Sequence, residues 1–136
     1  MKNIEHIGIA VKDFATSLPL FEKLLNTLCY KTEMVESENV NTAFFKTGEI
    51  KIELLESITS DGIIATYIEK RGEGIHHIAF ETEDIELEMK RLTSEGFQLI
   101  NVVPKKGADN KLVCFLHPKT TNGILIELCQ EMKGSQ

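Results

Sequence analysis

The sequence has few cysteines and no long apolar run, and both absences exclude classes of protein. Its three cysteines, Cys29, Cys114 and Cys129, are an odd number at wide spacing and form no CxxC motif. A disulfide framework or a zinc knuckle is therefore not expected, whereas free buried thiols fit a reducing cytosol. No apolar run approaches the length of a membrane span, and residues 1–20 lack the order of a signal peptide. We therefore expect a cytoplasmic protein that does not bind membranes.

An excess of positive charge is also missing. The formal net charge is −6 at pH 7, whereas nucleic-acid binding depends on the neutralisation of phosphates by lysine and arginine. A nucleic-acid partner is therefore not expected. Basic residues do concentrate in one place, where a single acid, Asp109, stands among Lys105, Lys106, Lys111 and Lys119. This segment could attract a small anion or could be an ordinary solvated loop, and composition leaves both interpretations open.

Two segments of the chain resemble each other, which indicates an internal repeat. Residues 4–13 read IEHIGIAVKD and residues 75–84 read IHHIAFETED, so that His6 and His77 occupy equivalent places, 71 residues apart. Each segment alternates like a strand and ends in an aspartate that can cap a helix. The length of 136 residues suits a single domain made from two such modules.

A helix is predicted after each aspartate, and three strands are predicted after each helix. In the first half the apolar spacing predicts a helix that begins near Thr16 or Ser17, with Pro19 in its first turn. In the second half the helix is expected to end at Gly96. The further strands are predicted at 31–36, 41–47 and 50–56 in the first half and at 97–103, 112–117 and 123–129 in the second.

A short helix from Ile63 to Lys70 is predicted between the halves. Ser60 or Asp61 can act as its N-cap, and Gly72 closes it. The single domain, residues 1–136, then consists of three parts: module one at about 3–57, the linking helix at about 60–72, and module two at about 74–130.

Four polar residues occupy equivalent positions in the two modules. Side chains alternate along a strand, so His6 and Glu53 point away from the bulky apolar face of their strands, and His77 and Glu127 do the same in the second module. The bulky faces should pack under the helices, which leaves the four polar residues on faces with small neighbours. His76 lies on the opposite face from His77 and is expected to be a structural or surface residue.

These four side chains form a set that suits a metal. Two imidazoles and two carboxylates provide nitrogen and oxygen ligands for a borderline divalent ion such as Co²⁺, Ni²⁺, Mn²⁺ or Zn²⁺. A single strand histidine or glutamate is more often a packing or surface residue, but four at repeat-equivalent positions favour ligands. We predict an α+β fold in which two βαβββ modules stand side by side and form a curved mixed sheet around a metal-binding cleft.

The same segments carry a resemblance to a known family. The runs HIGIAV, IELLE, EKRGEGIHHIAF, FLHPK and GILIEL are similar to those of methylmalonyl-CoA epimerase, which belongs with glyoxalase I to the vicinal-oxygen-chelate (VOC) superfamily. The similarity extends from about residue 3 to 130. It implies a homodimer and one divalent metal per chain, Co²⁺ first among the candidates, with His6, Glu53, His77 and Glu127 as ligands.

The resemblance also implies an activity. Such an enzyme interconverts the stereoisomers of methylmalonyl-CoA by α-proton abstraction through a metal-stabilised enolate. Glu127 and Glu53 are then the candidates for the two bases. Coenzyme A carries phosphates, and the sequence has no glycine-rich phosphate loop. Lys106, His117 and Lys119 are therefore the candidate substrate-binding residues.

Two features bear on the alternatives. Some epimerases carry an extra glutamate on the strand that here reads VNTA at residues 40–43, where no carboxylate stands. Glyoxalase I (lactoylglutathione lyase), the first alternative, usually has an aspartate-proline-glycine turn where this chain has HPKTTNG, which favours the epimerase. A metal-free VOC binding or resistance protein is the second alternative, although such proteins commonly lack the four ligands.

Overall fold

The computed structural model describes residues 1–132, which form two compact units. We call His6–His76 the N-terminal unit, and Met1–Glu5 together with the residues from His77 onward the C-terminal unit. Each unit contains the order strand, helix and three strands, and the N-terminal unit adds a helix at its end. The predicted α+β class and the repeated βαβββ module are therefore confirmed. The assignment of a single domain stays a prediction.

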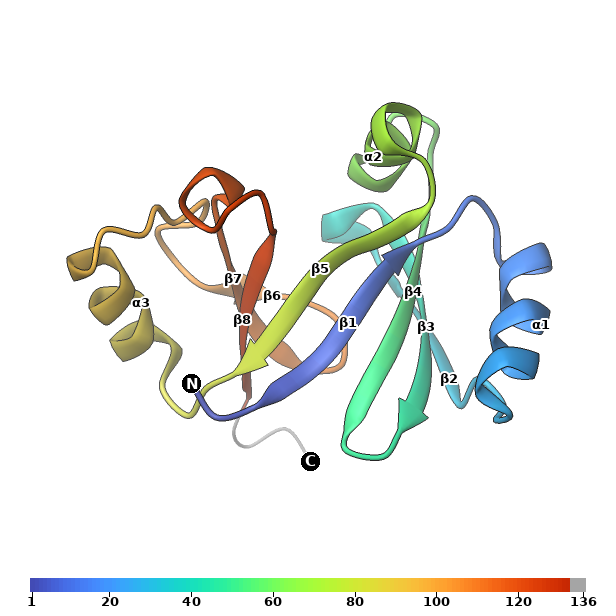
Figure 1. Cartoon of the computed structure of the whole chain (residues 1–136), viewed down its shortest axis with the longest axis horizontal. Helices are drawn as coiled ribbons and strands as arrows, with labels where there is room; N and C mark the ends of the chain where they lie inside the picture. Colours follow the sequence, from blue (N-terminus) through green and yellow to red (C-terminus); the bar gives the residue numbers. More distant parts are fainter. Residues whose placement is uncertain (133–136) are drawn as a thin grey trace. The chain divides into compact units, whose positions relative to one another are not determined.

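The N-terminal unit contains a mixed sheet in the order β2-β3-β4-β1. Strand β1 is parallel to β4, and the other two pairs are antiparallel. Figure 1 shows α1 beside these strands, with the short helix α2 after β4. The elements are β1 (Ile4–Ala10), α1 (Phe14–Leu25), β2 (Lys31–Val35), the 3-10 turn η1 (Glu36–Glu38), β3 (Val40–Thr47), β4 (Ile50–Ser57) and α2 (Ile63–Arg71).

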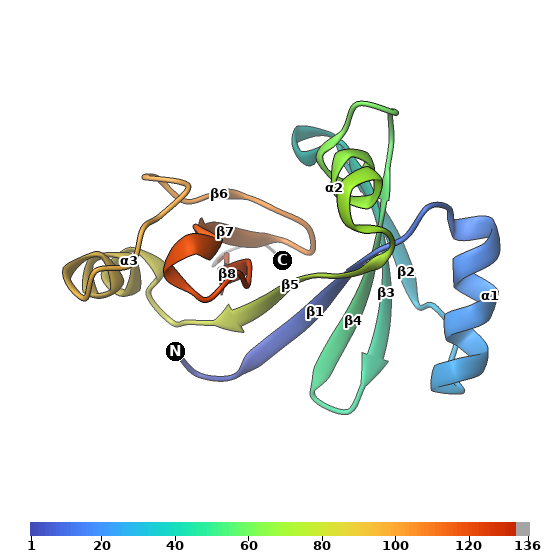
Figure 2. The same ribbon diagram turned by 45° about the horizontal axis from the view of Figure 1, so that its top comes forward.

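The C-terminal unit repeats this internal order, with β6-β7-β8-β5 as its sheet. Strand β5 is parallel to β8, and β7 is antiparallel to both β6 and β8. In Figure 2 the helix α3 lies beside β7 and β8. The elements are β5 (Gly74–Glu81), α3 (Ile85–Ser94), β6 (Lys105–Lys106), β7 (Lys111–Leu116), the 3-10 turn η2 (Pro118–Thr120) and β8 (Ile126–Glu131).

Helix α1 begins earlier than predicted, at Phe14. The Asp13 side chain accepts a hydrogen bond from the Thr16 backbone N–H at 2.7 Å, which confirms the aspartate cap and fixes the start of the helix. Pro19 is therefore inside the helix rather than in its first turn. Proline has no N–H for the carbonyl of Ala15, but both residues are exposed, so water can reach that carbonyl.

The strand predicted at 97–103 is wrong. Only an isolated bridge between Leu99 and Leu116 occurs there, and the two-residue strand β6 follows later. The side chain of Asn101 explains the interruption, because its Oδ1 accepts the backbone N–H of Phe115 at 3.0 Å. A side-chain oxygen thus occupies the place of a carbonyl in the ladder, and a regular strand cannot continue.

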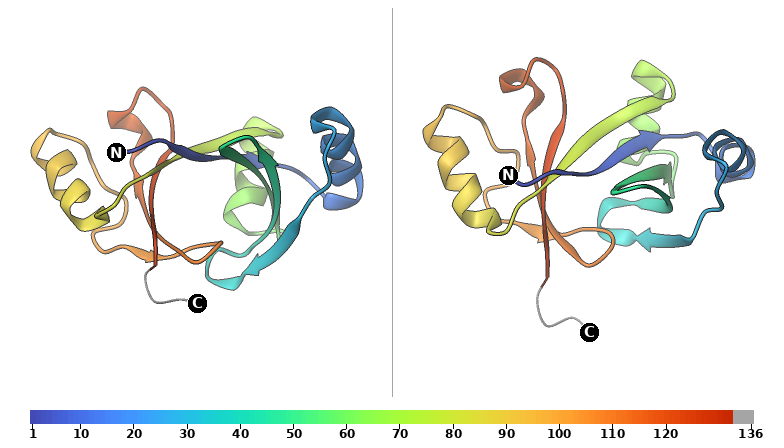
Figure 3. Two further views of the ribbon diagram at one scale, coloured as in Figure 1. Left: turned by 90° about the horizontal axis from the view of Figure 1, so that it is seen from below. Right: turned by 60° about the horizontal axis from the view of Figure 1, so that its bottom comes forward.

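Helices α1 and α3 each lie beside the sheet of their own unit, as Figure 3 shows from two further directions. Apolar residues of α1 pack against buried Ala43, Phe45 and Leu54. In the C-terminal unit the apolar face of α3 packs against Leu116 and Leu128. These are the bulky faces expected from the alternation along the strands.

The linking helix α2 confirms the predicted Ile63–Lys70 and extends it by one residue. Its N-cap is Gly62, which makes no side-chain capping bond, so the predicted Ser60 or Asp61 cap is wrong. Gly72 ends the helix at φ +79°, a conformation that favours glycine. Within residues 1–132, no helix is long and apolar enough to cross a membrane.

The three cysteines are free thiols, as predicted. Cys114 and Cys129 are fully buried, and Cys29 is half-buried. Burial raises the pKa of the Cys114 thiol and of the Cys129 thiol, which keeps both in the unreactive protonated form.

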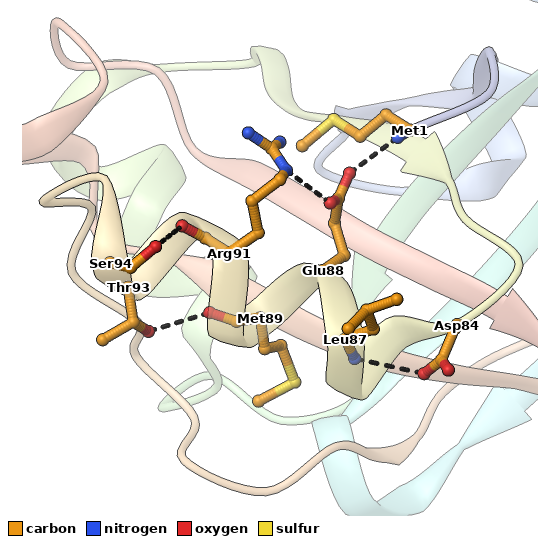
Figure 4. Close-up of polar contacts among 8 residues, drawn as sticks. All are labelled: Met1, Asp84, Leu87, Glu88, Met89, Arg91, Thr93 and Ser94. Atoms are coloured by element: carbon orange, nitrogen blue, oxygen red, sulfur yellow. Dashed lines mark hydrogen bonds and ion pairs between the residues drawn. The ribbon is translucent and has the colours of Figure 1, made fainter.

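The first residues of the chain are bonded to the rest of the C-terminal unit. The backbone N–H of Lys2 donates to the carbonyl of Glu81, and the N–H of Glu81 donates to the carbonyl of Asn3, each at 2.8 Å. The Met1 ammonium lies 2.6 Å from one carboxylate oxygen of Glu88. Arg91 Nε lies 2.7 Å from the other oxygen, as Figure 4 shows. These two cations hold the pKa of Glu88 at about 2.

Candidate active site

The N-terminal unit contains one of the two predicted histidine–glutamate pairs. Because Ile9 and Leu54 face α1, alternation directs His6 and Glu53 to the other face of the sheet. His6 Nδ1 lies 3.2 Å from Glu53 Oε2. Both residues are only 4% exposed. A buried carboxylate requires a partner, and the imidazole supplies one.

The C-terminal unit contains the second pair at the equivalent strand positions, but its contact uses the other imidazole nitrogen. Leu128 faces α3, so Glu127 points to the opposite face of the sheet. His77 Nε2 lies 3.1 Å from Glu127 Oε1, and both residues are 5% exposed. Each unit thus presents one imidazole and one carboxylate, buried and in direct contact.

Strand register explains why the two pairs are alike. Gly8 is the residue of β1 opposite Glu53, and Ala79 is the residue of β5 opposite Glu127. Each histidine stands two residues before this small residue and therefore points to the same face. Neither Gly8 nor Ala79 places a bulky side chain beside its glutamate. The repeat in the sequence therefore places the two histidine–glutamate pairs at equivalent positions of the two sheets.

Each glutamate also faces a phenylalanine, which sequence reasoning missed. Phe44 of β3 is opposite Glu53, and Phe115 of β7 is opposite Glu127. The rings of Phe115 and His77 are nearly perpendicular, with their centroids 5.8 Å apart, and Lys31 Nζ lies 4.6 Å from the centre of the Phe44 ring. The two phenylalanines are 71 residues apart, like the histidines, and this spacing was the signal that could have identified them.

The donor atoms of the two pairs fit a divalent metal. Imidazole nitrogen and carboxylate oxygen are ligands that Co²⁺, Ni²⁺, Mn²⁺ and Zn²⁺ accept. In each unit the two donors already converge to within 3.2 Å or less and are shielded from water. Each unit can therefore contribute one nitrogen and one oxygen ligand.

The predicted substrate-binding residues lie on two elements of the C-terminal unit. His117 and Lys119 belong to the same turn, in which His117 Nδ1 accepts the backbone N–H of Lys119 at 3.2 Å. This bond fixes the orientation of the imidazole ring. The side chain of Lys119 is exposed. Lys106 is also exposed, but it lies on the edge strand β6.

Lys111 does not belong to an open basic surface. It is 8% exposed, and its Nζ lies 4.0 Å from Glu5 and 3.9 Å from Glu131. Two carboxylates therefore compensate this charge inside the unit. The basic segment seen in the sequence contains one lysine whose role is internal, because buried charges require partners.

His76 lies outside the pairs, as predicted. Its ring packs edge-on against Tyr67 of α2 at a centroid distance of 4.9 Å. The Tyr67 hydroxyl donates to the carbonyl of Ile75 at 2.7 Å, which ties α2 to the start of β5. His76 is therefore a packing residue between a helix and a strand.

Comparisons with known proteins identify relatives over nearly the whole chain. The profile of the Glyoxalase/Bleomycin resistance protein/Dioxygenase superfamily matches residues 5–115. The Bacillus subtilis uncharacterized protein YqjC is 40% identical over 100% of this chain and 96% of its own length. The ethylmalonyl-CoA/methylmalonyl-CoA epimerase of Cereibacter sphaeroides is 36% identical over 93% of this chain and 96% of its own.

A solved structure shows the same similarity. A variant of the Streptomyces coelicolor methylmalonyl-CoA epimerase in complex with 2-nitronate-propionyl-CoA superposes with a TM-score of 0.92. It is 29% identical, and the match covers 98% of this chain and 96% of that one. The chain therefore belongs to the Glyoxalase/Bleomycin resistance protein/Dioxygenase superfamily and, within it, to the methylmalonyl-CoA epimerase family. It is an enzyme of the racemase and epimerase class.

Proposed function

We propose that the enzyme interconverts the stereoisomers of methylmalonyl-CoA by removing the α-proton from one face of the substrate and returning it to the other. The observation that carries this proposal is the pair of buried histidine–glutamate contacts, one in each βαβββ module. Epimerisation needs a proton acceptor on each side of one carbon. Two carboxylates at repeat-equivalent positions match that requirement.

We propose His6, Glu53, His77 and Glu127 as the ligands of one divalent metal per chain, with Co²⁺ as the first candidate and Ni²⁺, Mn²⁺ or Zn²⁺ as the others. The donor chemistry and the burial of both pairs support this assignment. When bound, such an ion supplies positive charge near the acyl oxygens, where negative charge develops as the α-proton leaves.

The protein's own groups would perform the proton transfer. In this proposal Glu53 and Glu127 act as the two bases, because an ionised carboxylate can accept a proton and return it. Phe44 and Phe115, which are opposite the two glutamates, would exclude water from the reacting carbon.

Substrate recognition is proposed to involve the basic residues of the C-terminal unit. Lys106 and Lys119 are exposed and can meet the phosphates of coenzyme A as point charges, and His117 is held in the same turn as Lys119. The enzyme is further proposed to be a cytoplasmic homodimer. Exposed apolar side chains on and after α1 support association; these are Leu20, Leu24 and Leu28.

Exchange of the substrate α-proton tests the proposed function. The enzyme is incubated with α-deuterated methylmalonyl-CoA in ordinary water, and deuterium loss is followed by mass spectrometry with and without a chelator. We expect rapid loss of deuterium that the chelator abolishes and that added Co²⁺ restores. No exchange by the metal-loaded enzyme would contradict the proposal, and efficient conversion of the methylglyoxal–glutathione adduct would favour glyoxalase I instead.

A further inference from the structure

The hydroxyl of Thr42 is a buried polar group for which residues 1–132 provide no partner. Thr42 lies in the middle of β3 and is 1% exposed. Within residues 1–132 its Oγ1 makes no hydrogen bond. A buried hydroxyl in that state loses its hydrogen bonds to water without replacement, a cost that a valine of the same shape would avoid.

Strand register places Thr42 on the same face of the sheet as Glu53. Ala43 and Phe45 of the same strand point to the opposite face, where Phe45 packs under α1. Thr42 is opposite Leu55 of β4, two residues beyond Glu53. Such diagonal neighbours are about 7–8 Å apart between their Cα atoms. That is about the span of a small acyl group, so one ligand can contact both side chains.

The internal repeat provides a natural control at this position. Val113 of β7 is opposite Cys129, two residues beyond Glu127, so it is the equivalent of Thr42. Val113 is 4% exposed and packs against Ala79 and Cys129. The module therefore folds with valine at this place, and nothing in its architecture requires a hydroxyl there.

We propose that Thr42 is a positioning residue whose hydroxyl donates a hydrogen bond to the carboxylate of the substrate's acyl group. The inference rests on the proposed function and adds a determinant of acyl-group specificity to it. A substrate carboxylate near Glu53 meets a like charge, which a hydrogen-bond donor on the same face offsets. The hydroxyl is covered in this structure, so the ligand reaches it after local side-chain rotation. Thr42 does not act as a base, because its hydroxyl does not ionise near neutral pH.

Thr42→Val tests the inference because it removes the hydroxyl and keeps the volume. The urea midpoint of the variant should equal or exceed that of the wild type, since an unpaired hydroxyl is removed. In the exchange assay kcat/KM for methylmalonyl-CoA should fall about tenfold or more, the value of a hydrogen bond to a charged group. Thr42→Ser keeps the hydroxyl and should retain most of the activity, even if the loss of a methyl group lowers its stability.

A second measurement identifies the substrate group that the hydroxyl contacts. Binding of methylmalonyl-CoA and of propionyl-CoA, which lacks the carboxylate, is compared by calorimetry for the wild type and Thr42→Val. The substitution should weaken methylmalonyl-CoA binding and leave propionyl-CoA binding unchanged. Thr47→Val is the matched control on the same strand, because the Thr47 hydroxyl donates to the Ile50 carbonyl at 2.9 Å. It should lose some stability and no activity.

The outcomes separate this inference from the proposed function. If the wild type exchanges the α-proton and Thr42→Val does so at the same kcat/KM, the inference is overturned and the proposed function stands. A loss of stability in Thr42→Val would also overturn it, because the hydroxyl would then have a structural partner. If the wild type neither exchanges nor binds methylmalonyl-CoA, both are overturned.

Discussion

The two units share one βαβββ module. Their central strands are alike, and their edge strands differ. The parallel pairs β1–β4 and β5–β8 place a histidine and a glutamate at equivalent strand positions and in contact in both units. The edge strands are unlike each other, since β2 has five residues and β6 has two. The strands that carry the histidine–glutamate pairs therefore have the same pairing in both units, whereas the edge strands differ in length. Edge residues have pairing on one side only and tolerate change.

A second difference lies in the side chains around the glutamates. Phenylalanine is opposite the glutamate in both units, but Thr42 in the N-terminal unit corresponds to Val113 in the C-terminal unit. In the described part of the chain, the unit with threonine has a buried hydroxyl that makes no hydrogen bond, and the unit with valine forms an apolar cluster with Phe115. Two copies of one fold therefore need not have equal roles in the reaction.

The largest expected effect comes from removing either proposed base. Glu53→Gln and Glu127→Gln each leave an oxygen that can bind a metal but cannot take a proton. Metal content should survive, while epimerisation should fall by ~10²-fold or more. Each variant keeps one base, so each should still exchange deuterium from one enantiomer, and the preferred enantiomer should differ between them.

Deuterium exchange, measured separately on each enantiomer of methylmalonyl-CoA, tests whether the two variants prefer different enantiomers. A nearly normal rate of inversion by Glu53→Gln would mean that this residue is only a ligand. The two units would then be unequal in the chemistry itself.

The next largest effect is expected on metal content, when substitutions of the neighbouring residues His77 and His76 are compared. His77→Ala removes a proposed ligand and should lose most of the bound metal, whereas His76→Ala removes only the ring packed on Tyr67. Chelation should lower the Tm of the wild type and of His76→Ala, because a ligand of the folded state stabilises it. Metal analysis of both purified variants is the measurement, and equal metal content would contradict the assigned site.

A smaller effect is expected where the chain start meets α3. Glu88→Gln removes a carboxylate that is paired with the Met1 ammonium and Arg91, and should lower the free energy of unfolding by roughly 1–2 kcal/mol. The folded state lowers the pKa of Glu88 to about 2 from 4.5. This contribution is therefore fully present above about pH 4.5 and is lost as the pH falls toward 2.

Urea unfolding of the wild type and of Glu88→Gln across this pH range checks the prediction. The difference between the two proteins should shrink as the pH falls below about 4.5. Glu86→Gln, an exposed carboxylate on the same helix, is the control and should change stability little. A pH-independent difference would show that the effect comes from packing rather than charge.

The smallest effect is expected for the exposed lysines. Replacing Lys106 and Lys119 together with alanine should raise KM for methylmalonyl-CoA by roughly two- to fivefold at low salt, because exposed charge contacts are weak and screened. The salt dependence of KM should decrease in the variant. Lys90→Ala, an exposed lysine on α3, is the control. An unchanged KM at every salt concentration would exclude these lysines from phosphate binding.

Local patterns in the sequence determined the faces of the strands and the equivalence of the two modules. Alternation along β1 and β5 directs His6 and His77 away from the helices, because side chains alternate on any strand whatever its partner. The aspartates at 13 and 84 cap their helices through bonds to residues three positions later, which is also a local contact. These features depend on neighbours in the chain, so they could be predicted.

Features that depend on distant residues were decided only by the tertiary structure. The partner of Glu53 across the sheet, Phe44, follows from strand register, and the missing strand at 97–103 follows from the Asn101 side chain bonding to Phe115. Lys111 is internal because Glu5, far away in sequence, lies beside it. Sequence periodicity specifies the face on which a side chain lies, but only the pairing of distant segments specifies what that side chain meets.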